Sequence, residues 1–425
     1  MEKIQSLTGM MDLIENKANK ANKADTANGI FYTEHILKDI FETYSISEIR
    51  TPALEDSSLF KRSVGDTSDI VNKELYTFMD KNDKSITLRP EGTASVIRSI
   101  IEKKIDNESN KFWYLGPMWR YERPQKGRYR QFSQAGVEIL GYSEGIAELE
   151  IVSIICSINK ALGIENSILK INHLGDKESK EKYCNALKNF LMPLSSKLDE
   201  KDIQRLNTNP LRVLDSKNSE TQEILKDAPK INDFLTDQSL DLLNLVKNTF
   251  SKECNIEIDH TLVRGLDYYT GFVFEAVSSD LGAQDAYLGG GRYDDLCKQL
   301  GGKDLPAIGM AIGIERLSLL TKTYKKNRTL ISFIIISSNL ESKAYKIAHN
   351  LRSINSSIDI DVQLSDGSLK SKLRRANKDN ASYAFIIGED ELKSENIIVK
   401  SLNDENSEQI IMNISEIENF IQNIK

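Results

Sequence analysis

Cysteine, histidine and tryptophan are scarce in this chain. Its 425 residues include four cysteines, four histidines and two tryptophans. Cys156, Cys184, Cys254 and Cys297 are widely separated and form no Cys-x-x-Cys pair, and among the histidines only His260 lies close to a cysteine. This pattern argues against a structural zinc site. It favours reduced, mostly buried thiols in a cytoplasmic protein.

Long apolar runs are also missing. The longest, around residues 330–336, is far too short to span a bilayer, and the first residues mix acids and bases without an apolar stretch. The net charge of −7 argues against a protein that coats nucleic acid indiscriminately, so any RNA contact requires local basic patches. We expect a cytoplasmic protein without a membrane segment, long enough for two or three domains.

One short segment, residues 262–271, concentrates polar side chains suited to ligand binding. Arg264 offers fixed donors to carboxylate or phosphate oxygens, and the adjacent Tyr268 and Tyr269 offer ring faces and hydroxyls. The flanking glycines allow a backbone to approach a ligand closely. The segment therefore predicts a substrate pocket on a β-prone stretch. On these residues alone, a strand end with a surface ion pair is an equal alternative.

Residues 112–141 predict a long hairpin with a positive tip. The arms, 112–119 and 130–139, carry aromatic and β-branched residues, and residues 124–127 supply turn chemistry. Only Glu122 locally opposes five basic residues at the tip: Arg120, Arg123, Lys126, Arg128 and Arg130. Such self-repulsion is expected where a loop faces nucleotide phosphates or an RNA backbone. The alternative is a solvated loop.

Two further segments are glycine-rich. Residues 309–317 predict an apolar strand that runs into a helix, with Arg316 near the junction, where it can reach a phosphate tail. A core strand followed by a helix with one exposed arginine is the simpler interpretation of this segment taken alone. Residues 289–294 do not complete the spacing of a dinucleotide-binding loop and by themselves indicate a turn.

Composition along the chain indicates its organisation. Residues 16–28 are a polar stretch, and residues 31–44 have apolar residues at helical spacing. Residues 75–78 and 86–88 flank a polar turn like a hairpin. The charged, helix-rich residues 172–251 predict an inserted helical domain.

Beyond a polar linker at residues 321–328, strands and helices alternate. This alternation predicts a compact α/β module built from residues 330–337, 341–351, 358–364, 369–377 and 383–387. The basic cluster on the second helix either contacts RNA or forms a solvated helix face: Lys370, Lys372, Arg374 and Arg375.

These segments together resemble the second and third signature motifs of class II aminoacyl-tRNA synthetases and the histidine-specific segment of the histidyl-tRNA synthetases. Residues 9–12, 50–55 and 87–93 resemble the family's start, its first motif and its substrate-amine segment. The resemblance implies an α+β fold, with a class II synthetase-type, mostly antiparallel sheet flanked by helices. Its catalytic core would span residues 1–325, interrupted by the insertion at about 172–251, with a C-terminal α/β anticodon-binding domain at 329–425.

The resemblance also implies a function. It is the ATP-dependent attachment of histidine to tRNA(His) through histidyl-adenylate, with release of pyrophosphate and AMP and with Mg²⁺ bound to the substrate. A cytoplasmic homodimer is implied, with the first motif at the subunit interface. By the same resemblance, Arg120 and Arg264 hold the α-phosphate and the substrate carboxylate, and Arg316 holds the distal phosphates.

The other site residues implied by the resemblance divide by role. Glu91, Thr93 and Gln134 take the α-amino group, and Glu138 and Tyr269 read the imidazole, which needs partners at both nitrogens when buried. Gly92 and Tyr268 belong to the same substrate-binding set. The remaining assignments are adenine to Glu122 and Phe132 and the tRNA acceptor end to Arg123 and Gln125. The sequence does not identify the metal ligands.

Two alternatives remain. The first is a non-catalytic regulatory paralogue of a synthetase, acting as a subunit of another enzyme. Such relatives usually lose parts of residues 264–269 and the C-terminal module, and this chain retains both. The second is a class II synthetase for another amino acid. Glu138 and residues 267–269 argue against this alternative.

Overall fold

The computed structural model describes residues 3–15, 26–65, 68, 70–282, 285–321, 328–336, 340–363, 367–403 and 408–424. The chain divides into two compact units, one comprising residues 1–13 and 29–323 and the other residues 14–28 and 324–425. Most of the predicted polar stretch at 16–28 and of the predicted linker at 321–328 lies outside the described residues.

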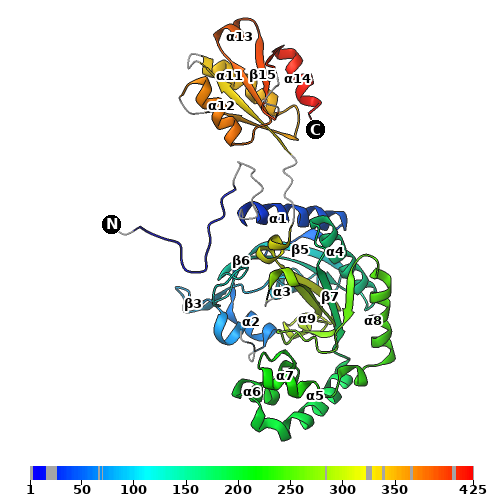
Figure 1. Cartoon of the computed structure of the whole chain (residues 1–425). Helices are drawn as coiled ribbons and strands as arrows, with labels where there is room; N and C mark the ends of the chain where they lie inside the picture. The colour runs from blue at the N-terminus through cyan, green and yellow to red at the C-terminus, as the bar shows by residue number, and fades with distance from the viewer. Residues whose placement is uncertain are drawn as a thin grey trace. The chain divides into compact units, whose positions relative to one another are not determined.

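An eight-stranded sheet forms the centre of the first unit (Figure 1). Its strand order is β1-β5-β6-β11-β10-β9-β7-β8. Neighbouring strands run antiparallel except at the two edges, where β1 pairs in parallel with β5 and β7 with β8. The expected mostly antiparallel sheet is therefore confirmed. The strands are β1 (Ser47–Glu48), β5 (Asn110–Trp119), β6 (Gln131–Leu140), β7 (Ser167–His173), β8 (Asn255–Ile258), β9 (Thr270–Ser278), β10 (Ala286–Arg292) and β11 (Ala307–Gly313).

The predicted hairpin of residues 112–141 is confirmed as β5 and β6. These strands pair without a break from Asn110 opposite Leu140 to Trp119 opposite Gln131. Most of β6 is buried because both faces of the sheet are covered, so apolar residues there follow one another rather than alternate. The predicted strand-to-helix passage at residues 309–317 is also confirmed, since β11 ends at Gly313 and α10 (Ile314–Leu320) begins at once.

Helices close the main core on the sheet. Side chains from α1 (Thr26–Thr43), α4 (Ile146–Leu162), α8 (Asp237–Phe250) and α10 form one apolar cluster with the strands. A second cluster combines α3 (Thr93–Glu102) and α9 (Leu296–Gln299) with the helices between β7 and α8. This second cluster contains Tyr268 and Tyr269, so the predicted pocket residues are part of the hydrophobic core.

A small antiparallel sheet lies beside the main one. Its strands, in the order β2-β4-β3, are β2 (Leu54–Asp56), β4 (Ser85–Leu88) and β3 (Thr77–Met79), and α2 (Ser57–Val64) follows β2. The predicted hairpin around residues 80–83 is confirmed as β3 and β4. Its turn is held by Asp80, whose Oδ1 accepts hydrogen bonds from the backbone N–H groups of Asn82 and Lys84.

The expected helical insertion occupies the connection from β7 to β8. Its helices are α5 (Lys177–Leu191), α6 (Glu200–Thr208) and α7 (Ser219–Leu225), with 3-10 helices at Met192–Lys197, Pro210–Asp215 and Ile231–Phe234. Residues 172 and 173 end β7, and α8 packs Leu242, Leu243 and Val246 into the main core against the sheet. We use the name helical insertion for residues 177–235 alone (Figure 1).

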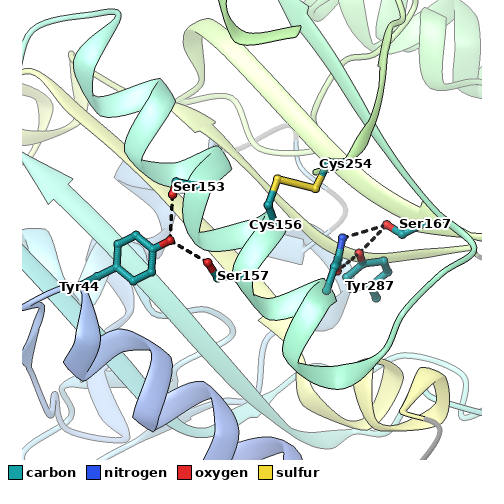
Figure 2. The surroundings of a disulfide bond; sticks show 8 residues. Tyr44, Ser153, Cys156, Ser157, Ser167, Cys254 and Tyr287 are labelled. Carbon is teal, nitrogen blue, oxygen red and sulfur yellow. Dashed lines mark hydrogen bonds between the residues drawn. A yellow bond between two sulfur atoms is a disulfide. The ribbon is translucent and has the colours of Figure 1, made fainter. Parts of the chain in front are cut away.

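Two of the four cysteines are bonded to each other. Cys156 on α4 and Cys254 form a disulfide with their Cα atoms 5.8 Å apart (Figure 2). The expectation of four reduced thiols is therefore wrong for this pair, and it holds for the free Cys184 and Cys297. Cys156 and Cys254 are separated by 98 positions in the sequence, and their proximity follows from the packing of α4 and α8 in one cluster. Nearby, the hydroxyl of Tyr44 forms hydrogen bonds with the hydroxyls of Ser153 and Ser157 on α4.

The second unit is an α/β module, as the alternation of residues 330–387 predicts. Its sheet has the order β13-β12-β14-β15-β16, parallel among the first three strands and antiparallel beyond. In the described residues no helix is long and apolar enough to cross a membrane. The elements are β12 (Thr329–Ile335), α11 (Glu341–Arg352), β13 (Ile358–Val362), α12 (Leu369–Lys378), β14 (Tyr383–Ile387), α13 (Glu389–Lys393), β15 (Asn396–Ser401), β16 (Ile410–Asn413) and α14 (Ile414–Gln422).

Candidate functional site

The N-terminus of α3 is built around a buried acid. Glu91 precedes the helix and is 3% exposed. Its carboxylate accepts hydrogen bonds from the backbone N–H groups of Thr93 (2.7 Å) and Ala94 (2.9 Å), which fills the donors that a helix start leaves open. Burial raises the pKa of Glu91, and these two hydrogen bonds and Arg120 act in the opposite direction.

Glu138 lies at the centre of the sheet. It projects from β6, is fully buried, and accepts hydrogen bonds from the Thr93 hydroxyl (2.7 Å) and from the Tyr293 hydroxyl. Burial raises the pKa of Glu138 to about 8, against the effect of the two hydrogen bonds. The structure thus joins Glu91, Thr93 and Glu138, three predicted substrate-binding residues that lie on different elements.

Arg264 lies against the adjacent strands β9 and β10. Its guanidinium forms an ion pair with Glu275 of β9 and covers Gly289, the residue of β10 that pairs with Glu275. A side chain at position 289 would collide with the guanidinium, so this glycine leaves the space that Arg264 fills. The segment is not a strand, contrary to expectation: residues 259–269 are turns and irregular backbone, and β9 begins at Thr270.

Four tyrosines line the same region. The rings of Tyr268 and Tyr269 lie 4.7 Å apart, and Tyr268 meets Tyr293 edge to face at 5.7 Å. Tyr114 of β5 is 4% exposed, and its ring lies against the backbones of both Gly92 and Gly136. A side chain at either glycine would collide with the ring. Gly92 therefore contributes to the site by leaving space for Tyr114.

Three buried polar atoms in this region have no hydrogen-bond partner among the described residues. They are Oε1 of Gln134, a residue of β6 that is 8% exposed, Nε of Arg264 and the hydroxyl oxygen of Tyr114. Buried polar atoms are normally paired, so the acceptor on Gln134 and the donor on Arg264 are available to a ligand that carries both kinds of group. An α-amino acid has a donating ammonium and an accepting carboxylate.

Arg120 begins the hairpin tip directly after β5. Its Nε donates to the backbone oxygen of Pro90 at 2.9 Å, and its guanidinium carbon lies 5.3 Å from the centre of the Phe132 ring. Pro90 immediately precedes Glu91. Arg120 therefore connects the buried acid at α3 with an aromatic face on β6, as an arginine between an amino-acid pocket and a nucleotide would.

Arg316 is half-buried rather than exposed. It donates to the backbone oxygen of Ala286, and the backbone of Gly127 at the hairpin tip lies against its side chain. Burial lowers the pKa of Arg316, and the nearby Arg128 acts in the same direction. Arg128 is itself paired with Glu122 at 3.1 Å, so the predicted adenine contact Glu122 belongs to this tip. The fold thus brings Arg316 close to Glu122, although the two residues lie far apart in the sequence.

The predicted tRNA contacts lie on the outside of the tip. Arg123 and Gln125 are exposed, and the backbone of Gln125 pairs with Arg128 in a two-way hydrogen-bonded bridge. Arg130 is directed back toward the protein instead, and the carbon of its guanidinium lies 3.9 Å from the centre of the Tyr121 ring. The backbone N–H of Arg130 donates to the backbone oxygen of Gly9. Gly9, the first residue of the segment 9–12, therefore packs on the hairpin.

Sequence reasoning missed three side chains of this site. Glu275, the partner of Arg264, is the only acid in the apolar strand β9. A single acid in an apolar strand indicates a basic partner, so this residue could have been identified from the sequence. Tyr293, the donor to Glu138, lies in the glycine-rich segment 289–294, which the pattern left as a turn. Tyr114 lies in the predicted hairpin arm without any motif of its own. All three assignments require strand neighbours that only the sheet order provides.

In the described part of the chain, no three His, Cys, Asp or Glu side chains lie close enough together to hold a metal ion. The pocket instead combines two buried acids, Glu91 and Glu138, with three arginines. Mg²⁺ is usually held by one or two carboxylates together with substrate phosphates and water. The residues present suit a metal that arrives with a phosphate substrate.

Comparisons with known proteins identify the family of this chain. The family model described as "Histidyl-tRNA synthetase" matches residues 24–317, and the one described as "Anticodon binding domain" matches residues 331–424. A protein from Francisella philomiragia named histidine–tRNA ligase is 42% identical over 440 residues, covering 100% of both chains. One of the same name from Francisella tularensis subsp. holarctica is 44% identical, covering 92% of this chain and 94% of its own.

A solved structure gives the same result. The crystal structure of apo Staphylococcus aureus histidyl-tRNA synthetase aligns with a TM-score of 0.78 and 30% identity, covering 99% of this chain and 100% of that one. The match to proteins named as ligases does not favour the regulatory paralogue. Since the family model spans most of the chain and relatives above 40% identity match its full length, the chain belongs to the histidyl-tRNA synthetase family.

Proposed function

We propose that the chain, a histidine–tRNA ligase by family, works through histidyl-adenylate. The carboxylate of histidine attacks the α-phosphorus of ATP, and pyrophosphate leaves. A hydroxyl of the terminal tRNA ribose then attacks the activated carbonyl, and AMP leaves. The observation that carries this proposal is Glu138, a fully buried carboxylate that is fixed by Thr93 and Tyr293 and lies close to Tyr269, which also lies close to Arg264.

The amino group of the substrate is assigned to Glu91, Thr93 and Gln134. Glu91 supplies negative charge, and Oε1 of Gln134 is a buried acceptor without a partner among the described residues. An ammonium donates three hydrogen bonds and accepts none, so it matches these groups. An incoming ammonium also favours the ionised form of Glu91, whose pKa burial raises.

The imidazole of the substrate is assigned to Glu138 and Tyr269, with the ring of Tyr268 as a wall of the pocket. A side chain without a donor cannot supply the further hydrogen bond that the carboxyl of Glu138 can accept beside those from Thr93 and Tyr293, and it is disfavoured for that reason. The hydrogen bonds from Thr93 and Tyr293 hold Glu138 in one orientation before substrate arrives. This preorganisation supports specificity for one amino acid.

The phosphates are assigned to the three arginines. Attack of a carboxylate on the α-phosphate brings two anions together, so positive charge aimed at the developing charge carries most of the acceleration. Arg120 and Arg264 would flank the α-phosphate and the substrate carboxylate, and Arg316 would take the distal phosphates. Phe132, already covered by Arg120, and Glu122 would hold adenine. Mg²⁺ would enter with ATP and neutralise phosphate charge.

The tRNA contacts and domain boundaries are part of the same proposal. Arg123 and Gln125, exposed at the hairpin tip, would face the acceptor end. Residues 1–325 would be the catalytic core, and residues 329–425 would read the anticodon. In that domain Lys370, Arg374 and Arg375 are exposed on α12, whereas Lys372 donates to the backbone oxygen of Ile335. The exposed three are the candidates for RNA contact.

A cytoplasmic homodimer completes the proposal. An open groove of about 460 Å³ lies at the sheet edge beside the first motif, lined by apolar and charged residues of both signs: Phe31, Glu34, His35, Lys38, Glu48, Arg50, Trp113 and Leu115. Arg50 is the first residue of that motif. Phe31, Trp113 and Arg50 are of residue types that are enriched at protein interfaces, and they support subunit contact at this edge.

ATP–pyrophosphate exchange with purified protein and Mg²⁺, assayed separately with each standard amino acid and without tRNA, tests the proposal. Exchange with histidine alone is expected. Exchange with another amino acid would keep the enzyme class and overturn the assignment of Glu138 and Tyr269. A folded protein without any exchange would contradict the adenylate mechanism and revive the regulatory alternative.

A further inference from the structure

The segment that carries Arg264, Tyr268 and Tyr269 has little regular structure of its own. We call residues 262–269 the substrate loop; they lie between β8 and β9 and form turns and irregular backbone. Two of its N–H groups bond to backbone oxygens, Leu262 to Asp259 (2.9 Å) and Asp267 to Val64 (3.4 Å). A loop outside a sheet or helix ladder takes its shape from the groups that contact it.

The helical insertion supplies several of those groups. Arg212 donates from Nη2 to the backbone oxygen of Gly265 (2.6 Å) and from Nε to Oδ1 of Asp267 (3.0 Å). Asn209 donates to the same Oδ1 at 3.0 Å, and Lys180 donates to the backbone oxygen of Tyr269 at 3.4 Å. One guanidinium therefore holds the loop on both sides of Leu266, using the fixed fork geometry of arginine.

Arg212 is itself held in place. It belongs to the 3-10 helix Pro210–Asp215, in which the neighbouring Leu211 and Val213 are 4% and 0% exposed. Both side chains lie in the apolar cluster that contains Tyr268 and Tyr269. The side chain of Arg212 is only 12% exposed, so its hydrogen bonds to Asp267 and Gly265 are charge-assisted and poorly screened by water.

We propose that Arg212 is a positioning residue, through which the helical insertion sets the shape of the amino-acid pocket. Without this guanidinium the loop occupies the binding-competent conformation for a smaller fraction of the time. The apparent affinity for the amino acid then falls by that fraction. The inference rests on the proposed function in that Arg264 and Tyr269 of the loop bind histidine. It adds that their placement depends on a side chain outside the pocket.

The first test separates positioning from general destabilisation. Arg212→Ala is expected to raise the KM for histidine about tenfold to a hundredfold in pyrophosphate exchange, the range for losing a charge-assisted hydrogen bond, and to leave the KM for ATP nearly unchanged. Arg212→Lys keeps the positive charge but not the forked guanidinium, so its KM for histidine is expected to lie between those of the wild type and Arg212→Ala. Arg205→Ala is the matched control.

Arg205 lies in the same insertion, on α6, and pairs with the buried Asp202 at 3.1 Å. Its side chain is 18% exposed, comparable to Arg212. Asp202 keeps hydrogen bonds from the hydroxyls of Ser216 and Thr221 when Arg205 is removed. If Arg205→Ala raised the KM for histidine as much as Arg212→Ala does, the effect would come from the stability of the insertion, and the proposal would be overturned.

The second test needs neither substrate nor activity. Hydrogen exchange of a peptide covering residues 262–270 is measured in the free protein, and Arg212→Ala is expected to speed it about tenfold relative to wild type and to Arg205→Ala. Equal exchange in all three proteins would overturn the coupling. This measurement does not depend on histidine. If the wild-type protein showed no histidine-dependent activity, the proposed function would be refuted, but hydrogen exchange would still show whether Arg212 positions the substrate loop.

Discussion

Tyr293 donates its hydroxyl hydrogen to Glu138, although the two residues lie 155 positions apart, with Glu138 on β6 and Tyr293 directly after the end of β10. The other carboxylate oxygen accepts from Thr93, so both oxygens of a fully buried acid are fixed from opposite sides. In this way β6, α3 and the end of β10 converge on a single carboxyl group. Its ionisation is then sensitive to every change in the pocket.

The first prediction concerns that ionisation. The pKa of Glu138 is raised from 4.5 to about 8 by burial. Between these pH values the folded chain holds a proton that the unfolded chain has released, so this group makes the free energy of unfolding decrease as pH rises. Glu138→Gln is expected to remove this contribution. Urea titrations from pH 5 to 8 should show a wild-type slope more negative by up to about 1.4 kcal/mol per pH unit.

Glu138→Gln is a suitable variant because the amide keeps one acceptor for Thr93, and the Tyr293 hydroxyl can accept from the amide nitrogen. Parallel pH profiles for the two proteins would show that Glu138 is already ionised in the folded, ligand-free protein.

The second prediction concerns Arg264. Arg264→Ala is expected to lower the rate of pyrophosphate exchange about a hundredfold to a thousandfold, as the loss of a preorganised charge donor does, while the chain stays folded. The substitution also leaves Glu275 without its ion-pair partner. The double variant Arg264→Ala/Glu275→Gln removes that complication. An exchange rate close to wild type in the double variant would exclude a catalytic role for the arginine.

The third prediction concerns the space around Tyr114. Gly136→Ala places a methyl group inside its ring and is expected to lower the free energy of unfolding by about 1–3 kcal/mol. In a Tyr114→Ala background the same change should cost nothing, since the ring is gone. Gly265→Ala is the control, because a Cβ there meets no atom of the described residues within 4 Å. A cost for Gly136→Ala that persisted without the ring would point to backbone strain instead.

The fourth prediction concerns the cysteines. Alkylation of the unfolded, unreduced protein should modify two thiols, Cys184 and Cys297, and prior reduction should raise the number to four. In Cys254→Ser the unreduced count should be three, because Cys156 is then released. Intact-mass measurement gives each count directly. Four modified thiols in unreduced wild type would contradict the disulfide.

The sequence allowed the local elements to be predicted, and the comparisons confirm the family. The hairpin of β5 and β6 and the passage from β11 to α10 depend on patterns within 30 residues, which periodicity and turn residues report. The disulfide and the pair of Arg264 with Glu275 depend on which strands and helices are neighbours in space. Strand order is a property of the whole sheet, so no local pattern predicts these contacts. The role of each site residue stays a prediction.

The chain path from β7 to β8 does not require the helical insertion. These parallel strands need a crossover, and α8, which packs against both, already provides one. Residues 177–235 are therefore topologically dispensable: a short link from β7 to α8 would leave a permitted chain path. They are not energetically dispensable, because they bury the outer side of the tyrosine cluster and bond to residues 265, 267 and 269. A chain without this segment would keep a permitted path through the sheet, but its pocket would lack one of its walls.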